Sequence, residues 1–168
     1  MSKVEKAKQQ YGLMERIISY IPGYRGYKEK EIRRETDRLV RMHATSRLKK
    51  ALDNMRELLS SIPLAEKDRE LADRVLIRLD MVKQKTERAV AGYAGLFDIV
   101  KVREDRLDQL IAHDEGLITE SEGILQRSAS LKNTSSLEDV RHGLEQVLEA
   151  VKAYEELLDR RAEIIKQL

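Results

Sequence analysis

The strongest pattern of apolar and polar positions lies in residues 137–168. Written as heptads, two positions of each heptad are apolar in this segment, and Arg161 is the one polar residue among them. The two positions hold Leu137, Leu144, Val151, Leu158 and Ile165, and Val140, Val147, Tyr154, Arg161 and Leu168. This spacing is typical of an amphipathic helix that lays an apolar stripe against other helices. Ser135 and Ser136, followed three residues on by Glu138 and Asp139, predict a capping box at its start.

Three more segments have helical periodicity. Residues 28–61 carry a stripe that begins at Ile32, Thr36, Leu39 and His43 and then drifts to Val40, Ala44, Ala51, Met55, Leu58 and Ile62. Residues 66–95 alternate steps of four and three through Ala72, Val75, Leu79, Val82, Thr86, Ala89, Tyr93 and Leu96. In residues 103–131, the positions expected to face inward are Leu107, Leu110, Ile111, Asp114, Ile118, Ser121, Leu125 and Ala129. Ile77 and Met81 lie off their stripe, one turn apart, and they are either a small second contact such as a dimer seam or ordinary scattered exposed apolar residues.

Turns around Pro63, around Gly92 and Gly95, and at residues 133–136 separate segments of about 30 residues. This organisation predicts an all-α fold with one domain. Residues 28–168 are expected to form an antiparallel four-helix bundle whose helices alternate up and down. Residues 92–102 are expected to cap one end of the bundle. Residues 1–21 are expected to form a short N-terminal accessory helix, followed by a Pro/Gly turn at 22–27.

Composition agrees with long helices, since 37% of the residues are charged and there are only 2 prolines and 8 glycines. No run approaches the ~20 apolar residues of a membrane span, and no signal-peptide pattern opens the chain. We therefore expect a cytoplasmic protein, with peripheral association at the membrane as the alternative. The absence of cysteine excludes disulfides and thiolate metal sites.

Charge is unevenly distributed along the chain. The net charge of +2 divides into +7 for residues 1–60 and −5 for the rest. This asymmetry indicates either a basic face for an anionic partner or complementary helices within one bundle. In residues 3–20, Val4, Ala7, Tyr11, Met14 and Ile18 share one side of a basic helix. That helix either packs on the bundle or binds an anionic membrane surface or a partner groove.

The first turn and the basic start of the next helix form a candidate partner- or anion-binding surface. Its residues are Tyr24, Arg25, Tyr27, Lys28, Arg33 and Arg34. Glycines and an arginine before a helix N-terminus suit a phosphate, because the first N–H groups of a helix are unpaired. The alternative is that the two tyrosines clamp the turn onto the bundle. Acidic residues alternate with the basic ones and neutralise part of their charge, which disfavours nucleic acid as a partner.

Catalytic and metal-binding patterns are missing from the sequence. There is no Glu-x-x-His pair of a di-iron bundle and no Gly-x-Ser-x-Gly motif, so we expect no metal, no cofactor and no enzyme activity. A candidate buried polar cluster consists of His43, Tyr93, Asp114 and Tyr154. It is either a hydrogen-bonded layer that fixes helix register or a pocket in which His43 and Asp114 contact a small ligand. Either way, Asp114 should pair with a His, Arg or Tyr across the bundle.

Two strings in the chain, Ile-Pro-Gly-Tyr-Arg-Gly-Tyr-Lys-Glu-Lys-Glu at residues 21–31 and Gly-Tyr-Ala-Gly-Leu-Phe-Asp at residues 92–98, resemble motifs of a family of prokaryotic helical-bundle proteins without an assigned activity. The resemblance implies a bacterial or archaeal cytoplasmic protein and transfers no functional residue.

Taken together, the patterns predict a non-enzymatic interaction or scaffold protein that binds a protein partner or a second copy of itself. The first alternative is a peripheral protein held on anionic lipid by its N-terminal helix. The second alternative is a small-ligand binder that uses the polar core of the bundle.

Overall fold

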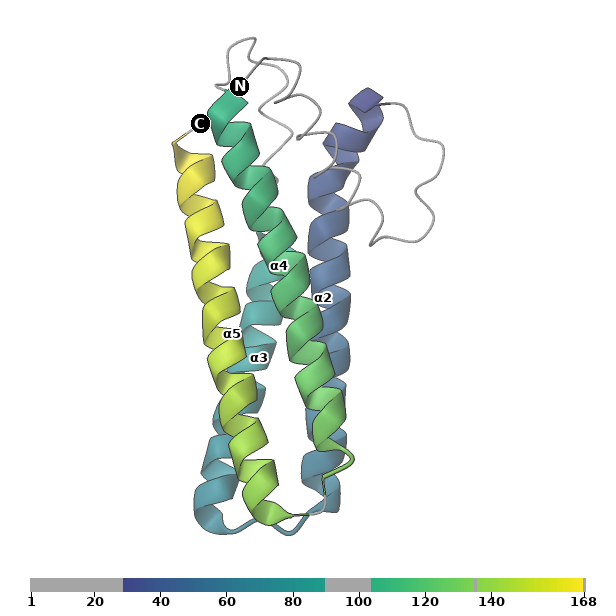
Figure 1. Cartoon of the computed structure of the whole chain (residues 1–168), viewed down its shortest axis with the longest axis vertical. Coiled ribbons are helices and arrows are strands. Elements are labelled where there is room, and N and C mark those ends of the chain that lie inside the picture. The colour runs from purple at the N-terminus through teal and green to yellow at the C-terminus, as the bar shows by residue number, and fades with distance from the viewer. Residues whose placement is uncertain (1–28, 90–103, 135, 168) are drawn as a thin grey trace.

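The computed structural model describes residues 29–89, 104–134 and 136–167, and the regular structure in them is entirely helical. The helices are α2 (Glu29–Ser61), α3 (Glu66–Arg88), α4 (Glu104–Leu131) and α5 (Leu137–Lys166) (Figure 1). Side chains are described from Arg38 in α2 and from Gln109 in α4, Ile111 excepted. The predicted all-α class is confirmed. The expected accessory helix, the turn at 22–27 and the cap at 92–102 lie outside the described residues.

The four helices surround one core in the order α2, α3, α5, α4. Helices α2 and α5 each contact both α3 and α4, and in the described part of the chain α2 does not approach α5, nor α3 approach α4. Both short turns, between α2 and α3 and between α4 and α5, lie at the same end of the molecule (Figure 1). Successive helices therefore alternate in direction, as expected.

The prediction of an antiparallel bundle needs one correction, because not all neighbouring helices in this ring are antiparallel. Asp68 pairs with Arg141 and Arg78 pairs with Glu155, so α3 and α5 run in the same direction. The pairs His43–Glu122 and Glu57–Lys132 show the same for α2 and α4. The chain thus forms two helical hairpins that lie side by side in the same orientation. The antiparallel contacts are confined to the interior of each hairpin.

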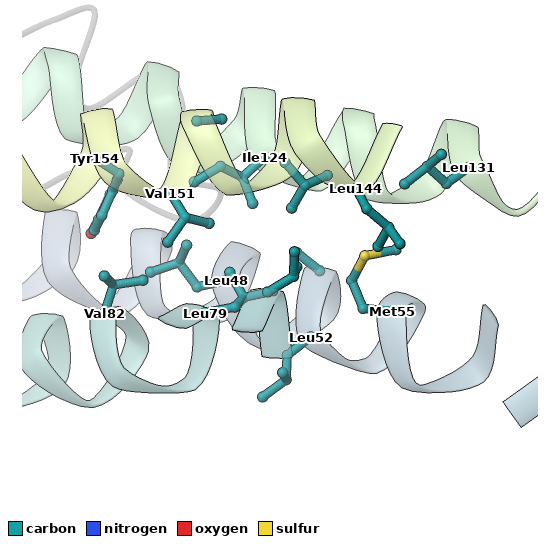
Figure 2. Close-up of a cluster of buried hydrophobic side chains, with 14 of the residues drawn as sticks. Leu48, Leu52, Met55, Leu79, Val82, Ile124, Leu131, Leu144, Val151 and Tyr154 are labelled. Carbon is teal, nitrogen blue, oxygen red and sulfur yellow. The ribbon is translucent and has the colours of Figure 1, made fainter. Parts of the chain in front are cut away.

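The predicted stripe of α5 faces the core. Leu144, Val147 and Val151 are completely buried, and Tyr154 and Leu158 continue the stripe. Figure 2 shows side chains from all four helices meeting there, among them Leu48 and Leu79 opposite Val151. In α3 the predicted positions from Ala72 to Thr86 are buried as well. Burial of this kind of stripe supplies the main favourable free energy of folding.

The inward face of α4 was predicted correctly over the first part of the helix and wrongly over its last two turns. The predicted positions Leu110, Asp114, Ile118 and Ser121 are buried. Further on, Ala129 is exposed and Leu125 only half-buried, whereas the buried positions are Ile124, Ser128 and Leu131. The buried serines are tolerated because Ser121 Oγ donates to the carbonyl of Ile118 at 2.8 Å and Ser128 Oγ to that of Leu125 at 2.7 Å. The prediction also missed Leu117, which is buried. In α2 it also missed Leu48 and Leu52, which are buried.

Helix lengths and one cap also differ from expectation. The helices contain 33, 23, 28 and 30 residues rather than about 30 each. The expected end of the second segment at residue 95 is wrong for α3, because Ala89 already has extended backbone with ψ of 138°. Helix α5 starts after Ser136 as predicted, but the Ser136 side chain forms no capping hydrogen bond. Only its backbone carbonyl accepts, from the N–H of Val140 at 3.0 Å.

Ion pairs join the basic first hairpin to the acidic second one. Lys85 pairs with Asp159 at 2.6 Å, and Arg78 pairs with Glu155 at 2.8 Å. These contacts place part of the charge asymmetry of the sequence inside the bundle.

One ion pair predicts the response to acid. Arg141 donates from Nε to Asp68 Oδ1 at 2.6 Å and from Nη2 to Oδ2 at 3.1 Å. The hydrogen bond to Arg141 lowers the pKa of Asp68 and outweighs the opposing effect of burial. A carboxylate with a lowered pKa stabilises the fold above its unfolded value of about 3.9 and loses that contribution as the pH falls. We expect Asp68→Asn to flatten the decline of the unfolding free energy below about pH 4.

The measurement is urea unfolding at a series of pH values. The control is Asp73→Asn on the same helix, because Asp73 is exposed and forms no ion pair with any described residue. Equal acid dependence in both variants would contradict the assignment of this effect to the Asp68–Arg141 pair.

Candidate functional site

The central polar contact of the bundle is an ion pair between α4 and α5. Arg161 Nε donates to Asp114 Oδ1 at 2.7 Å, and the two side chains are 2% and 0% exposed. Asp114 therefore lies inward and pairs with an arginine, one of the three partner types expected. Since both charges are removed from water, each depends on the other for its stability in the core.

A second polar contact joins α3 to α5. Thr86 Oγ1 donates to the carbonyl of Val82 at 2.7 Å, and it lies 2.8 Å from the hydroxyl of Tyr154. Because the threonine proton is used by Val82, Tyr154 donates its own proton to Thr86. Burial is the main cause that raises the pKa of Tyr154, and the negative charge of Asp114 adds to it. The tyrosine therefore stays neutral well into alkaline conditions.

This geometry predicts an asymmetric response to two substitutions. Tyr154→Phe removes one hydrogen bond but leaves Thr86 bonded to Val82, so we expect a loss of about 1 kcal/mol in unfolding free energy. Thr86→Val leaves the buried Tyr154 hydroxyl without its acceptor, and we expect the larger loss, of about 1–3 kcal/mol. Urea unfolding at neutral pH measures both values. A larger loss for Tyr154→Phe would contradict the donor assignment.

The raised pKa of Tyr154 also fixes the sign of the alkaline dependence. Above a pH of about 10, tyrosine in the unfolded chain ionises while Tyr154 in the folded protein stays protonated. The unfolding free energy should therefore fall with rising pH, and less steeply in Tyr154→Phe.

His43 belongs to a different contact. Its Nε2 lies 3.0 Å from Glu122 Oε1, across the interface of α2 and α4. Asp114 and Glu122 are eight residues apart on α4, which places them about 12 Å apart along the helix axis. The structure thus brings His43 to Glu122, and Asp114 to Arg161, in separate contacts. Of the candidate cluster, Asp114 and Tyr154 lie close enough for the negative charge of Asp114 to raise the pKa of Tyr154, and Tyr93 lies outside the described residues.

The candidate contact surface is mostly beyond what the structure describes. Tyr24, Arg25, Tyr27 and Lys28 precede the described residues. Arg33 and Arg34 lie in α2, in the part whose side chains are not described. The surface therefore stays a prediction.

The described residues contain no group of three or more His, Asp or Glu side chains that could hold a metal ion. None of α2 to α5 has the length and apolarity that crossing a bilayer requires.

A groove that the sequence did not predict lies between the C-terminal parts of α3 and α5. Its volume is about 770 Å³, and its apolar lining includes Met81 and Ala89 of α3 and Leu158, Ala162 and Ile165 of α5. The hydrogen bond between Thr86 and Tyr154 sets these two positions at the same height. Helix α3 ends two residues after Thr86, whereas α5 continues for twelve residues after Tyr154. The groove forms where α5 extends past the end of α3.

Paired charged side chains line this groove, and exposed apolar side chains lie next to it. Glu155 accepts hydrogen bonds from Arg78 at 2.8 Å and from Lys85 at 3.5 Å. Lys85 also pairs with Asp159, and this hydrogen bond is the main cause that raises its pKa. Next to the groove, Ile77 and Met81 are 60% and 52% exposed. The departure of these two side chains from the α3 stripe was the signal in the sequence. The end of α3 at Arg88 was not visible there.

The chain matches no protein-family model, no curated protein and no solved structure. The family resemblance of residues 21–31 and 92–98 therefore stays a prediction.

Proposed function

We propose that this protein is a non-enzymatic interaction or scaffold protein of the cytoplasm. In this proposal it is a four-helix bundle with an N-terminal accessory helix, and it acts by binding a protein partner on its outer surface. The observation that supports the proposal is the apolar groove between α3 and α5, next to the exposed side chains of Ile77 and Met81.

The polar core supports a structural role for the bundle interior. Asp114 pairs with Arg161, and Tyr154 donates to Thr86. Each contact joins two helices at one relative height, and a sliding or rotated helix would leave a buried charge or hydroxyl without its partner. These contacts favour one register of the helices. They hold the surface residues in fixed positions, as a binding scaffold requires.

The surface supports a binding role. Exposed large apolar side chains are ordinary when scattered, but a cluster next to a groove is typical of interaction sites. Ile77 and Met81 are one helical turn apart on α3, and Met81 itself lines the groove. On the Met81 side, the groove is therefore followed by a second exposed apolar side chain, that of Ile77.

Site-specific photo-crosslinking in the native host tests the proposal. A photoreactive amino acid is placed at Met81 in one variant and at Met42 of α2 in another. Met42 is a matched control, because it is 54% exposed and lies outside the groove. We expect adducts of higher mass from Met81 and few from Met42. Absence of adducts from each of the exposed large apolar side chains in the described residues, Met42, Ile77, Met81 and Leu137, would overturn the proposed function.

Co-sedimentation with anionic vesicles tests the membrane alternative directly. Residues 3–21 have the pattern of a basic amphipathic helix, so binding by that route should disappear when residues 1–21 are deleted. Such a loss, without adducts at Met81, would favour peripheral membrane association over a protein partner.

A further inference from the structure

We propose that the groove between α3 and α5 binds an acidic amphipathic helix of about three turns from a protein partner. This inference rests on the proposed function and adds to it the binding surface and the chemistry of the partner.

The dimensions of the strip suit a short helix. From Ile77 to Arg88, α3 contributes eleven residue steps, or about 16 Å at 1.5 Å per residue. From Glu155 to Lys166, α5 contributes a segment of equal length, but this segment lies further along the axis because Thr86 and Tyr154 are at the same height. Since α3 and α5 run in the same direction, the two segments form a staggered strip parallel to both axes. A helix of about 11 residues covers the α3 segment and reaches the start of the α5 segment.

The apolar surface suits a helix that approaches closely. Ala89 and Ala162 are small, so the backbone of a partner helix could come near the floor of the groove. Leu158 and Ile165 supply branched apolar surface between them. The side chain of Met81 is unbranched and adapts its shape to different partners. Apolar side chains at spacings of three and four on one face of the partner match this arrangement.

The charges around the strip favour an acidic partner. The two acids of the groove are already paired, Glu155 with Arg78 and Lys85, and Asp159 with Lys85. The two arginines at the ends of the exposed α3 face, Arg74 and Arg88, are exposed, and neither forms an ion pair with any residue that the structure describes. They flank Ile77 and Met81, one on each side. Carboxylates at both ends of a partner helix would complement them.

The same arginines disfavour a second copy of this chain as the occupant. In a twofold-symmetric dimer the strip would pair with itself, and α3 would lie antiparallel or parallel to α3 of the other copy, depending on the direction of the axis. Arg74 of one copy would face Arg88 of the other in the antiparallel case, and each arginine would face its own counterpart in the parallel case. Like charges in such positions oppose association.

Two designed peptides test the proposal by fluorescence anisotropy with the full chain. Both are stapled helices of about 14 residues with leucine on one face. One carries glutamate on its other faces and the other carries lysine. We expect the glutamate peptide to bind at least about tenfold more tightly, and the difference to shrink with added salt because salt screens exposed charges.

Three variants assign the binding to the groove. Met81→Glu places a carboxylate on the apolar strip and should weaken binding of the glutamate peptide at least about tenfold. Met42→Glu is the matched control and should leave it unchanged. The double variant Arg74→Glu/Arg88→Glu should reverse the preference between the two peptides. Circular dichroism and sedimentation velocity check that each variant is folded and unchanged in mass.

The outcomes separate this inference from the proposed function. Equal binding of the two peptides, or an unchanged preference in the double arginine variant, would overturn the acidic-helix proposal. If photo-crosslinks then form at other exposed positions, the interaction function stands and only the groove is excluded. A crosslink from Met81 to a second copy of this chain, with a dimer in sedimentation, would overturn the proposal in favour of self-association.

Discussion

Replacement of Asp114 by alanine is expected to lower the unfolding free energy by about 3–5 kcal/mol, the range for breaking a buried ion pair by removing one partner. The loss arises because the Arg161 guanidinium, 2% exposed, would remain in the core without its carboxylate. A buried charge that loses its ion-pair partner costs more than the lost hydrogen bond itself. The reverse substitution, Arg161→Ala, leaves a buried carboxylate and should be similarly costly.

The control for this prediction is Asp159→Ala. Asp159 also pairs with a cation, Lys85, but its side chain is 59% exposed. An exposed pair contributes about 0–1 kcal/mol, so the control should lose no more than that. Urea unfolding at pH 7 measures both. Equal losses in the two variants would show that Asp114 is not in a dry core.

A double variant distinguishes desolvation from lost attraction. Asp114→Leu/Arg161→Met removes both charges and keeps the volume roughly constant. Replacement of a buried ion pair by apolar residues is often neutral or stabilising. The double variant should therefore be more stable than Asp114→Ala, and a double variant that is less stable would contradict this account.

Replacement of Gly143 by alanine is expected to lower the unfolding free energy by up to about 2 kcal/mol. A Cβ at Gly143 would overlap Cδ2 of Leu131 and lie 2.9 Å from its Cγ, closer than atoms can approach. Both residues are buried in the contact of α4 with α5, so the whole Leu131 side chain must move. Overpacking of this kind costs about 1–3 kcal/mol, which exceeds the ~1 kcal/mol that alanine gains over glycine in a helix.

Gly123 provides the matched control on α4. A Cβ at Gly123 would meet only Nη1 of Arg127 at 2.8 Å, the mobile end of an exposed side chain that can swing away. Gly123→Ala should therefore raise the unfolding free energy by up to about 1 kcal/mol, through helix propensity alone. Thermal unfolding of both variants gives the two shifts. Opposite signs are expected, and a stabilising Gly143→Ala would contradict the close packing at Leu131.

The periodicity of α5 illustrates what a sequence can reveal. Its two apolar heptad positions are filled so regularly that the buried face from Val140 to Leu158 followed directly from spacing. Even Arg161, the exception in the stripe, was placed inward by its position. For Asp114 the same reasoning gave both the burial and the class of partner, because an isolated charge cannot stay ionised in an apolar core.

The predictions of the inward face of α4 and of the end of α3 were wrong in part, for physical reasons. In the last two turns of α4, Ser128 takes a buried position, and its hydroxyl is satisfied by the carbonyl of Leu125. A count of apolar residues therefore selects Leu125 and Ala129 there, which are not buried. For α3, the stripe continues in the sequence through Leu96, although the helix ends at Arg88. Apolar spacing marks where a helix would be buried, but it does not mark where the helix stops.

The sequence by itself determined that this chain folds as long amphipathic helices, and it identified most residues of their inward faces, because burial of a stripe depends on local spacing. Only the tertiary structure decided that the two hairpins lie in the same orientation, that His43 and Asp114 have separate partners, and that a groove opens where α5 passes the end of α3. These features depend on contacts between residues that are 47 to 79 positions apart in the chain. No spacing within a single helix encodes that relation.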